Sequence, residues 1–178
     1  MSTTLAQGSS EVLSVLSGQH EQLKALMHQV VSCPVHDRQE VFDDVRHLLA
    51  AHEAAEAEVV HPLAHRVLHT QAAVVTARLA EEDEAGAAIG RLEHVDITSG
   101  QFATEFAALQ TSVIAHAEAE EDQELAVVAG ALAATQQREI LAALSQVPVF
   151  AHSPAVQLDT FAAMLLAARD HFRRPAQP

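Results

Sequence analysis

The chain has 178 residues, the length of one domain or of one domain with an appendage, and a formal net charge of −14. Such an acidic chain is a poor partner for nucleic acids and anionic membrane surfaces, and its longest apolar run, residues 125–134, is too short to span a bilayer. The single cysteine, Cys33, excludes an internal disulfide, and no signal peptide is recognisable, so we expect a cytoplasmic protein.

Residue composition and apolar periodicity predict an all-α fold. Ala, Leu, Val and Glu dominate, and there are only six Gly and six Pro. Apolar residues recur at steps of three and four along four long segments, which is typical of core-facing bundle helices. We therefore expect an up-down-up-down four-helix bundle over residues 10–130 and one or two extra helices over 131–172. Residues 1–9 and 173–178 are expected to be disordered tails.

The first two predicted helices, over residues 10–31 and 37–61, carry polar residues in their apolar stripes. His20 occupies such a position in the first helix. His52 and Glu56 do so in the second, and because they are four residues apart they lie on one face and can reach one point. A proline separates these helices, and another is expected to end or kink the second helix.

The next two predicted helices, over residues 73–95 and 99–128, show the same pattern. Glu82 lies in the apolar stripe of the third helix. His116 and Glu120 lie in the stripe of the fourth helix and repeat the spacing of four residues. A carboxylate that is buried without a partner is very costly, so each must be protonated, paired or bound to a cation.

His94 is the alternative to Glu82 on the third helix. It lies about 120° around the helix from Glu82 and outside the apolar stripe. In an antiparallel helix pair, residues at one level are equally far from the turn. The midpoint between Glu82 and His116 is residue 99, in a polar turn sequence, whereas the midpoint between His94 and His116 is residue 105, within a helical pattern. Connection lengths therefore favour Glu82.

The remaining segment is expected to extend the bundle. The stripe of the fourth helix continues through Val127, and Thr135 can cap a short helix that ends near residue 145. Pro148 is expected to separate this helix from the last one, over residues 153–172, which starts with an N-cap followed by proline. These two helices are expected to cap the bundle or to contact a partner, such as a second copy of the chain.

Six polar residues in core positions are thus expected at one level of the bundle: His20, His52, Glu56, Glu82, His116 and Glu120. Glu and His projecting inward from facing helices are how metal sites are built in helical bundles. Imidazoles and carboxylates without thiolate suit iron or manganese better than structural zinc. Six ligands suffice for two ions if Glu56 and Glu120 bridge them, with positions left for an oxo or hydroxo group and an exogenous molecule.

Three other residues are weaker candidates for the site. Glu53 is one residue off the stripe of the second helix and could be an extra ligand. His61 could contact the centre from outside the ligand set. His61, His65 and His69 are spaced four apart and could form a second metal patch, although such a run is more often a solvated helix face.

The sequence resembles the haemerythrin-like family, also called the HHE cation-binding domain, over about residues 10–128. The matching residues are His20, the motif His52-Glu53-x-x-Glu56, and the motif His116-x-x-x-Glu120-Glu121. The resemblance implies a non-haem di-iron centre that reacts with, or senses, dioxygen, peroxide or nitric oxide. It also implies that Glu56 and Glu120 are the bridging carboxylates.

One departure from the oxygen-carrying members bears on function. Those proteins have a pair of histidines on the third helix, whereas residues 80–84 hold carboxylates and no histidine. Because carboxylates stabilise ferric over ferrous iron, we expect redox turnover of peroxide or related oxidants rather than reversible oxygen carriage. The alternatives are an iron- or oxygen-responsive sensor that signals through the C-terminal helices, and a structural bundle that holds manganese or zinc.

Overall fold

The computed structural model describes residues 2–67 and 72–173, and within them it contains only helices and their connections. The elements in chain order are α1 (Ser2–Ser32), α2 (Arg38–Ala55), the π-helical turn η1 (Glu56–Val60), α3 (His61–Val67), α4 (Ala72–Leu92), α5 (Gly100–Glu120), the π-helical turn η2 (Glu121–Leu125), α6 (Ala126–Ala131), α7 (Ala134–Ala151), the short 3₁₀ helix η3 (Pro154–Val156) and α8 (Phe161–Arg173). His69 and the predicted tail from residue 174 onward lie outside the described residues.

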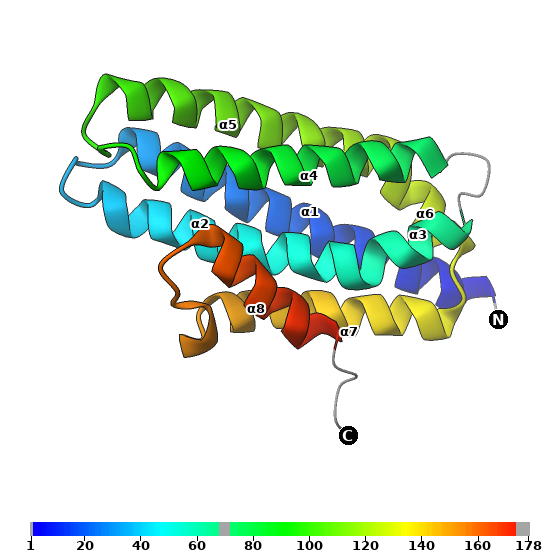
Figure 1. Ribbon diagram of the computed structural model, residues 1–178. Helices are drawn as coiled ribbons and strands as arrows, with labels where there is room; N and C mark the ends of the chain where they lie inside the picture. Colours follow the sequence, from blue (N-terminus) through cyan, green and yellow to red (C-terminus); the bar gives the residue numbers. More distant parts are fainter. Residues whose placement is uncertain (1, 68–71, 174–178) are drawn as a thin grey trace.

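Four antiparallel helical rods form the bundle, which confirms the predicted fold (Figure 1). The rods are α1, α2 with η1 and α3, α4, and α5 with η2 and α6. The connections from α1 to α2 and from α4 to α5 lie at one end of the bundle, and α3 and α6 lie at the other. Within the bundle, α1 packs on α2 and α5, and α4 packs on α5. This arrangement brings the middle of all four rods to one level.

The first rod begins earlier than the sequence pattern suggests. Helix α1 starts at Ser2, in the segment that was expected to be a polar tail. Once a helix is nucleated, each further residue adds one backbone hydrogen bond, and no proline interrupts these residues.

A π-helical turn changes the register of the fourth rod. The apolar stripe of α5 buries Phe106, Leu109 and Val113, as predicted. From the end of η2 onward the buried residues are Leu125 and Val128, whereas Val127, which we expected in the stripe, is 50% exposed. A π-helical turn accommodates one residue more than an α-helical turn, so the stripe moves by one position along the sequence.

The C-terminal extension covers one side of the bundle. Helix α7 packs on α1 and α2, and α8 packs on α2 (Figure 1). The prediction that Pro148 separates two helices is wrong, because α7 continues through Pro148 to Ala151. The carbonyl of Leu144, four residues before this proline, accepts a hydrogen bond from the side chain of Gln19 instead.

Arg46 anchors the start of α8 to the bundle. Its Nη2 atom donates to Glu93 Oε1 at 2.5 Å and to the carbonyl of Asp159 at 2.8 Å. The backbone N–H of Phe161 donates to the same Glu93 oxygen at 2.6 Å. The Arg46 side chain is 8% exposed, so this ion pair is shielded from solvent and ties α2, the end of α4 and α8 together.

None of the helices described over residues 2–67 and 72–173 is long and apolar enough to cross a membrane.

The register shift at η2 predicts different stabilities for two truncations. Leu125→Ala removes a side chain that is 1% exposed and should lower the free energy of unfolding by about 2–5 kcal/mol. Val127→Ala changes an exposed side chain and should alter it by less than about 0.5 kcal/mol. Urea denaturation followed by circular dichroism measures both values, and the reverse order would place Val127 in the core.

Candidate metal centre

The six side chains that the sequence analysis selected converge inside the bundle. Five of them are at least 93% buried, and the side chain of His116 is 13% exposed. One comes from α1, two from the α2–η1 junction, one from α4 and two from the end of α5, in the order His20, His52, Glu56, Glu82, His116 and Glu120. The equal connection lengths of antiparallel rods bring these residues to one level.

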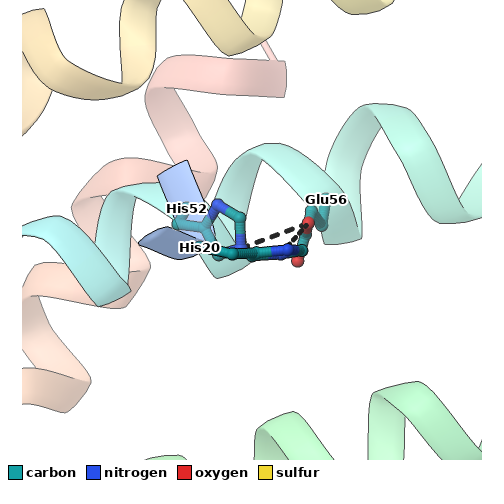
Figure 2. Close-up of side chains that lie close together, drawn as sticks. All are labelled: His20, His52 and Glu56. Carbon is teal, nitrogen blue, oxygen red and sulfur yellow. Dashed lines mark ion pairs between the residues drawn. The ribbon is translucent and has the colours of Figure 1, made fainter. Parts of the chain in front are cut away.

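Two groups of potential ligand atoms share one carboxylate. The ligand atoms of His20, His52 and Glu56 all lie within 4.8 Å of one another, and so do those of Glu56, Glu82 and His116. Figure 2 shows both imidazoles of the first group directed at Glu56, with Nε2–Oε1 distances of 3.9 Å for His20 and 3.2 Å for His52. Each group is therefore a candidate cation position, and Glu56 belongs to both.

Buried atoms without hydrogen bonds indicate that cations fit here. Among the described residues, five buried atoms at this level have no hydrogen-bond partner: His20 Nε2 and both carboxylate oxygens of Glu56 and of Glu120. Burying such groups without hydrogen bonds is unfavourable, and the imidazoles of His20 and His52 are their nearest partners. A bound cation would supply a further partner, and the mixed nitrogen and oxygen donor set suits iron or manganese.

Glu120 adjoins the first ligand group, because it faces the same ring nitrogen of His20 that faces Glu56. Its Oε2 atom is 3.2 Å from His20 Nε2, and its exposed fraction is zero. It belongs to neither of the two close groups found among the described residues. As the last residue of α5, it therefore lies beside the candidate ligands through its contact with His20.

Each of the three imidazoles has a hydrogen-bond partner for its other ring nitrogen. His20 Nδ1 is 2.7 Å from Glu121 Oε1, and His116 Nδ1 is 3.0 Å from Glu81 Oε2. His52 Nδ1 is 3.0 Å from Gln19 Oε1. Partners of this kind fix the tautomer and the ring orientation of metal-binding histidines.

These partners were not identified as such from the sequence, although a signal exists. Gln19, Glu81 and Glu121 each directly adjoin a candidate ligand in the chain, at positions 20, 82 and 120. Each of them contacts a histidine that lies on a different helix from its own. A polar residue beside a ligand, at the level of the site, is therefore the pattern to look for.

The weaker candidates occupy different places. His61 is buried, and its Nε2 atom lies 2.5 Å from Glu82 Oε1, so it holds the carboxylate of one candidate ligand. Glu53 is 4% exposed and lies beside the site. His94 is exposed in the turn after α4. The structure thus places Glu82, and not His94, with the other predicted ligands.

A small pocket opens beside the centre. Its volume is about 20 Å³, enough for one water-sized molecule. His20, His52, Glu53, Glu82 and His116 line it, together with apolar side chains. The candidate ligands thus line a pocket of small volume.

Burial controls the protonation of the candidate ligands. Burial, and next the negative charge of Glu120, raise the pKa of Glu56 well above its usual value. Burial would also raise the pKa of Glu120, but the adjacent His20, followed by His52 and His116, outweighs it and lowers that pKa. Burial, followed by the charge of His20, lowers the pKa of His52 well below its usual value, so this imidazole is neutral and ready to bind a cation.

The raised pKa of Glu56 predicts that metal binding releases a proton. Below the raised pKa of Glu56, a cation must displace a proton from this carboxyl group, so metal affinity should rise with pH until the group ionises. His52 adds no proton because its pKa is lowered. Calorimetric titration with zinc, in buffers of different ionisation enthalpy over a pH series, measures the proton count. An affinity that is independent of pH, with no proton released, would contradict this protonation state.

The position of Glu82 predicts a contrast between two variants. Glu82→Ala should lower the metal content well below about two ions per chain, because it removes one member of the second ligand group. His94→Ala should retain the metal, because His94 is exposed after α4. Elemental analysis of the purified variants measures both. Loss of metal in His94→Ala alone would show that the α4 register is wrong.

Comparison with known proteins agrees with this geometry. Residues 11–128 match the profile of the hemerythrin HHE cation binding domain. No curated protein sequence and no solved structure matches the chain. The profile covers well over half of the 178 residues, including all six candidate ligands. The chain therefore belongs to the haemerythrin family of HHE cation-binding domains, which bind metal inside a four-helix bundle.

Proposed function

We propose that the chain is a non-haem di-iron protein that reacts with small oxidants, namely peroxide, dioxygen or nitric oxide. The observation that carries this proposal is the sharing of Glu56 between two groups of close, buried ligand atoms. A shared carboxylate is what a pair of neighbouring metal ions requires. The family match supports metal binding, and the donor set supports iron, with manganese or zinc as the competing ions.

The candidate residues divide between two ions. His20, His52 and Glu56 would hold one ion, and Glu82 and His116 would hold the other together with Glu56. Glu120, whose oxygens are buried without a hydrogen bond among the described residues, is the second candidate for a bridging position. Bound iron would supply the electron transfer.

The surrounding residues control access and protons. The pocket beside the centre is small, so it suits a small oxidant better than a bulky organic substrate. Burial raises the pKa of Glu53 well above its usual value, and this residue lines the same pocket. Its carboxyl oxygen can therefore hold a proton beside a bound oxidant.

A sensor without turnover is the second candidate function. It is favoured by the packing of α7 and α8 on α2, the helix that leads directly into His52 and Glu56. Metal or oxidant occupancy would stabilise α2, and the two C-terminal helices would carry the change to a partner.

The first experiment loads the metal-free protein with ferrous iron and measures iron content, absorbance and peroxide consumption. The chain has no Trp and no Tyr, so charge-transfer bands in the near ultraviolet and visible are readily seen. About two irons per chain, such bands and catalytic peroxide consumption are expected. Glu56→Ala should abolish all three, whereas the exposed Glu118→Ala should abolish none. Two irons without turnover would favour the sensor, and no iron binding would contradict both functions.

A further inference from the structure

The proline inside α7 leaves a backbone acceptor for a residue of another helix. Pro148 has no N–H group, so it cannot donate to the carbonyl of Leu144, four residues earlier in α7. Leu144 is fully buried, and a buried carbonyl without a donor is costly. The side chain of Gln19, on α1, supplies the donor, because its Nε2 atom lies 2.8 Å from this carbonyl oxygen.

Bonding to Leu144 determines the orientation of the Gln19 amide. The carbonyl accepts only, so the NH₂ group of Gln19 must face it, and Oε1 must face the other way. That oxygen lies 3.0 Å from His52 Nδ1. Because Oε1 also accepts only, His52 must carry its proton on Nδ1. The lone pair of Nε2 is then free, 3.2 Å from Glu56 Oε1, at the first candidate cation position.

We propose that Gln19 is a positioning residue that links the C-terminal extension to the metal centre. The relay runs from the Leu144 carbonyl through the Gln19 amide to the His52 ring, and it fixes the tautomer in which Nε2 can bind a cation. The proposal rests on metal binding by His52, which is part of the proposed function, but not on any reaction with oxidants.

The environment of Gln19 supports this assignment. The residue is 7% exposed, so water competes little for either end of its amide. The corresponding partners of His20 and His116 are the carboxylates of Glu121 and Glu81. A carboxylate at position 19 would place an anion against the Leu144 carbonyl, so the neutral amide is the group that satisfies both neighbours.

Replacement of Gln19 tests the relay, with a second buried glutamine as the matched control. Gln19→Met keeps the length of the side chain but removes both hydrogen bonds. Gln137→Met removes a comparable buried amide, whose Nε2 atom donates to the Leu132 carbonyl at 3.2 Å. Urea denaturation of both metal-free variants shows that each folds and measures how much stability each loses.

Two readouts distinguish positioning from general destabilisation. The first is the His52 tautomer in the metal-free protein, followed by ¹⁵N NMR of histidine-labelled protein and assigned by comparison with His52→Gln. The second is the affinity for cobalt(II), measured by its absorbance. Gln19→Met should remove the pure Nδ1–H tautomer and weaken cobalt binding about 10- to 100-fold, whereas Gln137→Met should change neither. An unchanged tautomer and affinity in Gln19→Met, or equal losses in both variants, would overturn the proposal.

A third variant tests the part assigned to the proline. Pro148→Ala gives the Leu144 carbonyl a second donor, and because its two lone pairs can accept both, the bond from Gln19 should weaken rather than break. Cobalt affinity should fall to a value between those of the unaltered protein and Gln19→Met. An affinity equal to that of the unaltered protein would overturn the role of Leu144. Because these readouts need neither iron nor an oxidant, they stand even if peroxide turnover is absent.

Discussion

The burial of two carboxylates between apolar helices is the constraint on which this structure depends. Glu56 and Glu120 are fully buried, and their oxygens have no hydrogen-bond partners among the described residues. In an apolar core, a net negative charge is tolerated only with a proton or a cation beside it. Without metal, the raised pKa of Glu56 and the imidazoles beside Glu120 limit the uncompensated charge. A bound cation would compensate the charge that remains and would stabilise the folded bundle.

The two motifs lie at equivalent places in the two rods that carry them. Glu56 is the first residue of η1, and Glu121 is the first residue of η2, directly after Glu120. A π-helical turn widens the helix and is common at functional sites. In this bundle both turns begin where the carboxylates enter the core. The two π-helical turns and the buried carboxylates thus lie at the same level of the fold.

The sequence predicted the bundle and the convergence of the ligands because both follow from helical periodicity and connection length. It preferred Glu82 over His94 for the same reason, and the structure places Glu82 at the centre. It missed the shift that exposes Val127, since the extra residue of a π-helical turn leaves no mark in a regular repeat. It also missed the continuation of α7 through Pro148, because the compensating donor, Gln19, is 125 residues away from Leu144 in the chain.

Helix α7 packs with the four rods as part of the same unit. The family profile stops at residue 128, before α7 begins at Ala134. Yet α7 covers α1 and α2, and its Leu144 carbonyl receives the side chain that holds His52. A chain cut at the family boundary would expose apolar side chains of both helices to water and leave the Gln19 amide without its acceptor. The unit recognised by sequence similarity is thus smaller than the unit that packs together in the structure.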